Sequence, residues 1–336
     1  MSSLIELRNI DMVFQRQGRV IGTKRKFHVL KNISLNIEEG EILALVGESG
    51  CGKTTLGKII TGLLRPTKGD LLYKGNSVYK IFNTNYQEFR KSVQFIQQDS
   101  YAALNPVRTV YQSIAAPIKA HNKELSKEQV FEKVEELLEI VGLIPAVQFI
   151  DKFPHQMSGG QRQRVLFARA LTMKPRLIVA DEPVSMIDVS LRLSILNLMA
   201  ELNKKLNIAF VYITHDLATA RYIANDGRIA VMYLGEIMEL SSVSELLNNP
   251  KHPYTQALIS AVPIPDPRLA RQQKALPIKN MDFMSMENRI DGCPFFSRCI
   301  YGEGKCINRH IDYVNAEGSY VKCCNLEKVK RWEKQV

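Results

Sequence analysis

The sequence lacks any apolar run long enough to cross a bilayer, and its first residues lack the basic-then-apolar pattern of a secretory signal. We therefore expect a soluble, cytosolic chain that can still dock on a membrane component. Internal repeats are also absent. Acidic residues are outnumbered, 34 against 45 basic ones, which gives a formal charge of +11. This balance favours a phosphate ligand, a nucleic acid or an anionic membrane surface as a neighbour, without choosing among them.

The chain has 336 residues, of which 45% are hydrophobic, so it can bury a sizeable core and global disorder is not expected. Short apolar runs of the buried-strand type, one of them leading through a glycine-rich loop into a helix, predict a parallel α/β sheet. The expected strands cover residues 42–46, 177–180 and 208–214, and the helix begins at Lys53.

Other local signals extend this organisation. Ser126 and Gln129 form a capping box that begins a helix, and Gly142 ends it. Two strands are expected to turn at Gly235. The proline-rich stretch 262–273 is interpreted as a linker to a C-terminal appendage.

A glycine-rich loop, GESGCGKT, follows the first expected strand and fits the phosphate-loop pattern G-x-x-x-x-G-K-[ST]. Glycines let backbone N–H groups turn inward around a β-phosphate, and the helix N-terminus adds positive potential. Lys53 supplies a charge between the β- and γ-phosphates, and the Thr54 hydroxyl is a ligand for Mg²⁺. The candidate ATP contacts in this region are Gly47, Glu48, Ser49, Gly50, Cys51, Gly52, Lys53, Thr54 and Thr55.

The stretch RLIVADEP places two adjacent carboxylates at the end of a buried strand. We expect Asp181 to hold Mg²⁺ through water and Glu182 to orient and polarise the attacking water. Such pairs also occur as helix caps, so this assignment depends on the phosphate loop. After the next strand, YITHD places His215 where it can contact the γ-phosphate, although a lone histidine is more often structural.

A second anion-binding loop follows in MSGGQRQRVLFARAL. Ser158 and the amides of Gly159 and Gly160 precede a helix, so they form another helix N-terminus suited to phosphate. One triphosphate does not need both loops from the same copy. We therefore expect a head-to-tail pair, in which this loop of one subunit closes on the γ-phosphate held by Lys53 of the other.

These motifs, with Gln98 in FIQQD and Asp188 in SMIDVS, resemble those of ABC transporter ATPases in order and spacing over about residues 4–265. The resemblance implies a P-loop NTPase fold: a RecA-like parallel sheet core, an antiparallel β subdomain and a helical subdomain at about residues 100–165. It implies that Gln98 contacts the metal and relays to the helical subdomain. The ATP contacts outside the phosphate loop would be Phe14, stacking on adenine unless it is a core residue, and Ser158, Gly159, Gly160, Gln161 and Asp188.

Longer stretches, above all NPKHPYTQALISAVPIPDP, resemble the oligopeptide/dipeptide importer ATPases. This implies an ATP-hydrolysing subunit, peripheral on the cytoplasmic side of the cell membrane, that powers peptide uptake. Its partners would be a second ATPase (a heterodimer, or a homodimer in isolation), two permease subunits and, indirectly, an extracytoplasmic binding protein. The sequence departs from the family pattern at Cys51, Ser100, Met157, Met186 and Ile187. None of these departures removes a ligand or a charge.

Five of the six cysteines lie in the last fifth of the chain, which favours a metal site over a disulfide in a reducing compartment. Structural zinc would favour Cys-x2-Cys pairs, which are absent. Four wider-spaced thiolates favour a [4Fe–4S] cluster, as in the subfamily that the chain resembles, with zinc or no metal as alternatives. The predicted ligands are Cys293, Cys299, Cys306 and Cys323, with Cys324 as a substitute for Cys323.

The expected organisation is a nucleotide-binding domain at residues 1–261 and a small Cys-rich C-terminal domain at 262–336. One rival hypothesis is a soluble ABC ATPase that acts on nucleic acid or the ribosome. Such proteins usually carry two cassettes or a long coiled coil, and this sequence has neither. A second rival is a nucleotide sensor that does not hydrolyse ATP, which Glu182 and His215 argue against.

Overall fold

The structure, a computed structural model, describes residues 3–17, 24–79, 84–262, 268, 276–280, 291–307 and 309–332. Among these residues, none of the helices is both long and apolar enough to span a bilayer. Most of the proline-rich stretch 262–273 lies outside the described residues.

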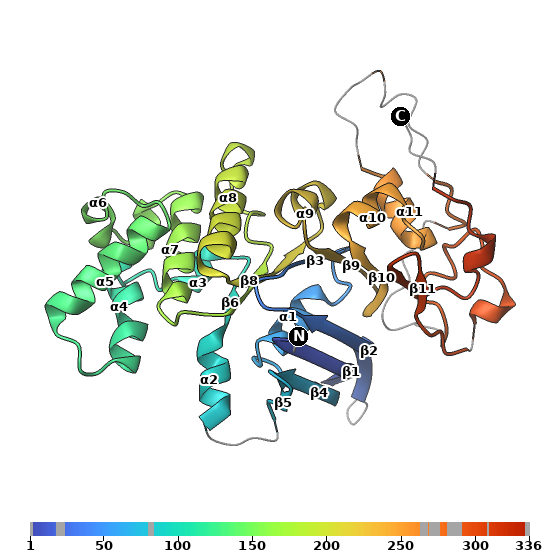
Figure 1. The fold of residues 1–336 in the computed structure, drawn as a ribbon, viewed down its shortest axis with the longest axis horizontal. Coiled ribbons are helices and arrows are strands. Elements are labelled where there is room, and N and C mark those ends of the chain that lie inside the picture. Colours follow the sequence, from blue (N-terminus) through green and yellow to red (C-terminus); the bar gives the residue numbers. More distant parts are fainter. Residues whose placement is uncertain are drawn as a thin grey trace.

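An eight-stranded sheet runs through the middle of the molecule in the order β11-β12-β10-β9-β3-β8-β7-β6 (Figure 1). The strands from β9 to β6 are parallel, and β10, β12 and β11 continue the sheet in antiparallel pairing. The parallel α/β sheet predicted from the sequence is confirmed. The strands are β3 (Ile42–Gly47), β6 (Val93–Ile96), β7 (Leu177–Asp181), β8 (Ala209–Thr214), β9 (Arg228–Tyr233), β10 (Glu236–Ser242), β11 (Val314–Ala316) and β12 (Ser319–Val321).

The central strands are buried on both faces, which explains their nearly continuous apolar sequence. Along β3, Ala44 and Val46 pack into one hydrophobic core, whereas Leu43 and Leu45 pack into another. The same alternation holds along β7 and β8, because successive side chains of a strand point to opposite faces. One core joins the sheet to the helical elements, and the other joins it to a second sheet.

The second sheet is antiparallel, with the order β2-β1-β4-β5, and it covers one face of the central sheet with α1 between them (Figure 1). This is the antiparallel layer that the sequence predicts. Its elements and the neighbouring helices are β1 (Ile5–Gln17), β2 (Lys24–Ile37), β4 (Lys68–Tyr73), β5 (Asn76–Ser77), α1 (Lys53–Ile60) and α2 (Thr84–Ser92).

Helical elements gather at one end of the molecule (Figure 1). The predicted capping box is present: the Ser126 hydroxyl accepts from the amide of Gln129, whose side chain accepts from the amide of Ser126. The helix ends just before Gly142, as expected, where φ is +75°. The elements here are α3 (Ser100–Ala103), α4 (Val110–His121), α5 (Lys127–Ile140), α6 (Val147–Ile150), η1 (Pro154–Gln156), α7 (Gly159–Leu171) and α8 (Val189–Leu206).

The C-terminal segments lie at the other end and are joined to the central sheet (Figure 1). The short hairpin of β11 and β12 pairs with β10, so Glu239 lies opposite Val321 and Leu240 opposite Tyr320. The remaining elements are α9 (Leu217–Ile223), α10 (Val243–Asn248), α11 (Pro253–Ser260), η3 (Gly304–Cys306) and η4 (Leu326–Lys328).

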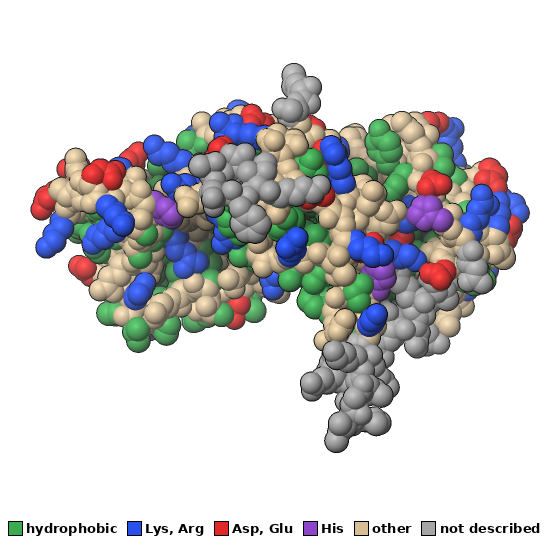
Figure 2. Space-filling view, turned by 90° about the horizontal axis from the view of Figure 1, so that it is seen from below, with side chains coloured by type: hydrophobic (Ala, Val, Ile, Leu, Met, Phe, Trp, Pro, Cys, Tyr) green, Lys and Arg blue, Asp and Glu red, His purple; other side chains and the backbone are tan. Residues whose placement is uncertain are grey.

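Charged side chains of both signs are interspersed over the face seen in Figure 2. Lys and Arg occur at both ends of this face with Asp and Glu among them, rather than in one basic stripe.

His252 links α11 to the central sheet from a buried position. Its Nδ1 accepts from the amide of Tyr254 at 3.0 Å and so caps the helix, while its own amide donates to Glu239 at 2.9 Å. Burial lowers the pKa of His252 to about 3 from its ordinary 6.5. Between pH 6.5 and about 3, His252 is therefore neutral in the folded protein, whereas it is protonated in the unfolded chain.

The His252→Asn variant tests this effect, because an asparagine oxygen can replace Nδ1 as the cap. Between pH 6.5 and about 3 the unfolded wild-type chain binds a proton at this position that the folded chain does not. The free energy of unfolding should therefore fall as the pH falls, by up to about 1.4 kcal/mol per pH unit from this group. Urea denaturation at pH 7, 6 and 5 should show a shallower decline for His252→Asn. The exposed His121→Asn variant should keep the wild-type slope, and equal slopes in all three proteins would contradict the assignment.

Candidate active site

Three motif-bearing loops leave the central sheet at one edge. In the parallel register Val46 pairs with Thr214, and Asp181 pairs with Ile213. The next residues along the chain are the phosphate loop, Glu182 and His215. Ligands of open α/β sheets bind beyond the carboxyl ends of the strands, so this edge is the candidate active site.

The phosphate loop wraps around a buried lysine. The Lys53 ammonium donates to the carbonyls of Gly47 at 2.8 Å and Glu48 at 2.9 Å, and Lys53 is only 5% exposed. The loop then enters α1 at Lys53, as the sequence predicts. Gly50 at the loop's tip has φ of +78°, and a Cβ added there would meet no atom within 4 Å. The tip therefore borders open space, and its backbone has the left-handed conformation that favours glycine.

Asp181 lies at the end of β7 and is 4% exposed. Burial raises the pKa of its carboxyl, a hydrogen bond with Thr54 lowers it, and the charge of Glu182 raises it further. The structure thus brings together the Thr54 hydroxyl and the Asp181 carboxylate. Hydroxyl and carboxylate oxygens are the donor types that Mg²⁺ prefers, so these two residues fit a magnesium site.

Glu182 is held by two side chains from neighbouring loops. Gln98 Nε2 donates to one carboxylate oxygen at 3.0 Å, and His215 Nδ1 lies 3.1 Å from the other. The backbone of Glu182 has φ of +45°, an uncommon conformation for a residue with a side chain. The sequence predicts the roles of these three residues separately, but it does not predict that they form one cluster or that Glu182 is strained.

The Ser158 loop begins α7 on the helical side of the molecule. The Ser158 hydroxyl accepts from the Gln161 amide at 3.3 Å, and the Gln161 side chain accepts from the Ser158 amide at 3.0 Å. A Cβ added to Gly159 would lie 3.1 Å from the Met186 carbonyl oxygen. Within the described part of the chain, no hydrogen bond or ion pair joins residues 158–161 to the phosphate loop.

Two other predicted ATP contacts are exposed. Phe14, on β1, is 39% exposed, so it is not a core residue. Asp188 is also exposed, and it precedes α8 without capping it through its side chain. Both side chains are therefore accessible to a ligand or to another chain.

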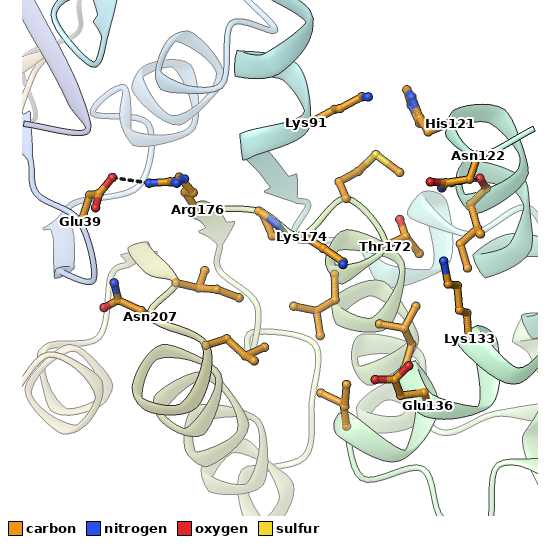
Figure 3. A pocket seen from close by; sticks show the side chains of 18 residues that line it. Glu39, Lys91, His121, Asn122, Lys133, Glu136, Thr172, Lys174, Arg176 and Asn207 are labelled. Atoms are coloured by element: carbon orange, nitrogen blue, oxygen red, sulfur yellow. Dashed lines mark hydrogen bonds and ion pairs between the residues drawn. The ribbon is translucent and has the colours of Figure 1, made fainter. Parts of the chain in front are cut away.

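A cavity of about 800 Å³ lies at the opposite ends of the parallel strands (Figure 3). Its wall includes Arg176, which precedes β7, and Asn207, which precedes β8. None of the predicted ATP contacts lines it. A smaller cavity of about 420 Å³ instead includes Glu182, Thr214 and His215 in its wall. The chemistry-bearing residues therefore adjoin the smaller cavity.

The phosphate loop also contacts a residue that no sequence motif indicated. Arg298 Nη1 donates to the Glu48 carboxylate at 2.9 Å, although the two residues are 250 positions apart. The hydroxyl of Tyr254 accepts from the Glu48 amide at 3.3 Å. Contacts over such sequence distances leave no local pattern.

The predicted iron–sulfur cluster is wrong. Within the described residues, which include all six cysteines, no group of three or more His, Cys, Asp or Glu side chains could hold a metal ion, zinc included. Burial raises the pKa of Cys293, Cys299 and Cys323. Cys324, the proposed substitute ligand, instead donates through its Sγ to Cys306 at 2.9 Å.

Comparison with known proteins gives matches over nearly the whole chain. A family model for the ABC transporter matches residues 30–185, and one for the oligopeptide/dipeptide transporter C-terminal region matches residues 238–306. The oligopeptide transport ATP-binding protein AppF of Bacillus subtilis is 40% identical over 96% of this chain and 97% of its own length. The dipeptide transport ATP-binding protein DppF of Escherichia coli is 40% identical over 89% of this chain and 87% of its own.

A solved structure of a dimeric ATP-binding cassette in a post-hydrolysis state, bound to ADP and Pi, is also similar. Its TM-score is 0.62 at 29% sequence identity, covering 71% of this chain and 98% of the other. A dimeric bacterial ABC transporter cassette gives a TM-score of 0.62 at 30% identity, with the same coverage. These similar proteins are ATP-binding cassettes or ATP-binding proteins of transporters.

Two alanine substitutions in the phosphate loop should lower the free energy of unfolding by clearly different amounts. A Cβ on Gly47 would lie 2.1 Å from the Met232 carbonyl oxygen, whereas one on Gly50 would meet nothing. Gly50→Ala should lose only about 1–2 kcal/mol of unfolding free energy, from the left-handed backbone. Gly47→Ala should lose about 3 kcal/mol or more, because main chain must also move. Urea denaturation measures both, and equal losses would show that the close approach of Gly47 to Met232 is not a constraint.

Proposed function

This chain belongs to the ABC transporter family, among the oligopeptide and dipeptide transport ATP-binding proteins, and from that membership we propose that it hydrolyses ATP to power uptake of di- or oligopeptides or related solutes. It would act as a peripheral subunit on the cytoplasmic side of the cell membrane. The observation that carries the proposal is the convergence of the phosphate loop, Asp181 and the Glu182 cluster at one sheet edge.

The phosphate loop would hold the triphosphate. Its tip borders open space at Gly50, and Lys53 is buried at its centre with its ammonium among backbone carbonyls. Backbone amides and the start of α1 would carry the interaction with phosphate oxygens. Phe14 would stack on the adenine. The proposed contacts are Phe14, Gly47, Glu48, Ser49, Gly50, Cys51, Gly52, Lys53, Thr54 and Thr55.

Thr54, Asp181 and Gln98 would hold Mg²⁺. When bound, the metal would neutralise charge that develops on the transferred phosphoryl group. The burial of Asp181 strengthens its interaction with a cation, because the surroundings screen charge less than water does.

Glu182 would orient and polarise the attacking water. Gln98 and His215 each hold one of its carboxylate oxygens, so its position is fixed from two neighbouring loops. His215 would also contact the γ-phosphate. Because Gln98 links Glu182 to the loop that leads into α3, it is the proposed relay between the site and the helical subdomain.

The site would be completed by a second ATPase subunit, the same chain or a related one, arranged head to tail. The residues that would reach across are Ser158, Gly159, Gly160, Gln161 and Asp188. The exposure of Ser158 and Asp188 supports this arrangement. Two permease subunits and, indirectly, an extracytoplasmic binding protein would be the further partners. The boundary between the nucleotide-binding domain and the C-terminal domain is proposed at residues 261 and 262.

The alternative of a soluble ATPase acting on nucleic acid or the ribosome has no support among these relatives. The interspersed charges of Figure 2 also provide no basic stripe on that face.

The Glu182→Gln variant tests the proposed catalytic role. It should bind ATP with Mg²⁺ but lose turnover by at least about 100-fold, because an amide can hold the water but cannot accept its proton. It should also accumulate as a dimer with ATP, since the closed pair would not be released by hydrolysis. Phosphate release and size-exclusion chromatography measure the two effects.

The Glu201→Gln variant is the matched control, because Glu201 forms its ion pair with Lys205 on the exposed surface of α8. It should turn over at the wild-type rate. Normal phosphate release by Glu182→Gln would remove Glu182 from its proposed role.

A further inference from the structure

Glu48, the second residue of the phosphate loop, is fixed at three of its groups. Its carbonyl accepts from the Lys53 ammonium at 2.9 Å, and its amide donates to the Tyr254 hydroxyl at 3.3 Å. Its carboxylate accepts from Arg298 at 2.9 Å. Tyr254 lies in α11, and Arg298 lies in the C-terminal segment (residues 291–307 and 309–332), so this segment contributes directly to the geometry of the loop.

Arg298 is itself held in place. Its side chain is 10% exposed, against 28% for that of Glu48. The Arg298 amide donates to the Phe295 carbonyl at 3.0 Å, and its guanidinium carbon lies 5.7 Å from the Phe295 ring centre and 5.9 Å from that of Tyr233. Because its side chain is packed against rings, the guanidinium delivers its charge to a defined point beside the phosphate loop.

The aromatic residues between the loop and the C-terminal segment form one cluster. Tyr233 lies 4.6 Å from Tyr254 and 5.5 Å from Phe295, measured between ring centres, and all three are nearly fully buried. Burial, with the charge of Glu48, raises the pKa of the Tyr254 hydroxyl, which therefore stays protonated. The surroundings of the Arg298–Glu48 pair are thus poor in water on the protein side, where charges interact more strongly.

A carboxylate in a phosphate loop opposes the binding of a polyanion. An ionised Glu48 without a counter-charge would repel phosphate oxygens, whereas a paired Glu48 would not. We propose that Arg298 is a positioning residue for the phosphate loop, which neutralises Glu48 and thereby sets the affinity for a nucleoside triphosphate. The C-terminal segment is then a determinant of nucleotide affinity. This inference rests on the proposed ATP site.

Two single substitutions separate this role from a purely structural one. In Arg298→Ala the Glu48 charge is uncompensated, so the Kd for a fluorescent ATP analogue with Mg²⁺ should rise about 10-fold. In Glu48→Gln the amide still accepts from Arg298, and the loop gains net positive charge. The Kd of this variant should fall about 3-fold. If the ion pair only fastened the C-terminal segment, both variants would weaken binding.

The double variant Arg298→Ala with Glu48→Gln completes the cycle, and its Kd should return to within about 3-fold of the wild-type value. Lys305→Ala is the matched control, because it breaks an exposed ion pair with Glu327 in the same segment, and its Kd should equal that of the wild type. Arg298→Lys, which retains the charge, should stay closer to the wild type than Arg298→Ala.

Unfolding free energies are measured in parallel, and if Arg298→Ala does not fold, the Glu48→Gln and Arg298→Lys results decide. Weaker binding in both single variants, or no change in folded Arg298→Ala, would overturn the inference. A wild-type protein without saturable binding of Mg²⁺–ATP would instead overturn the proposed function, so the two failures are distinguishable.

Discussion

The parallel register of β3, β7 and β8 is the constraint on which the rest of the structure depends. It brings the loops that follow Val46, Asp181 and Thr214 to one edge of the sheet, although they are far apart in sequence. A slip by one residue would place Leu43 and Leu45 in the core that now holds Ala44 and Val46, so the different sizes of the side chains facing the two close-packed cores oppose it. The positions of the functional side chains at this edge therefore depend on how the strands that lead to them are packed.

Within that edge, the groups are held by partners from other elements. Glu182 keeps a left-handed backbone while Gln98 and His215 hold its carboxylate, so the cluster stores strain at the position proposed to activate water. Glu48 is held similarly, from α11 and from the C-terminal segment. The β11–β12 hairpin also extends the central sheet. The C-terminal segment is therefore joined both to the sheet and to the phosphate loop.

Local patterns allowed much of this to be predicted from the sequence. The alternation of strands and loops, the capping box at Ser126 and the helix start at Lys53 depend on short-range chemistry and are confirmed. The contact between Glu48 and Arg298 depends on tertiary packing, so no local signal exists for it. The iron–sulfur prediction was wrong because cysteine spacing along the chain does not determine how the side chains are arranged in space, and among the described residues they form no group that could hold a metal ion.

Each ATP site is proposed to be shared by two chains in head-to-tail arrangement. Ser49 and Ser158 are both exposed and would face each other across such a pair. The most direct measurement mixes Ser49→Cys and Ser158→Cys proteins, each also carrying Glu182→Gln, and scores disulfide-linked dimers with and without Mg²⁺–ATP. The account predicts linked dimers in the mixture with nucleotide, and none above background in either protein alone. Linkage in the mixture no greater with nucleotide than without it would contradict the shared site.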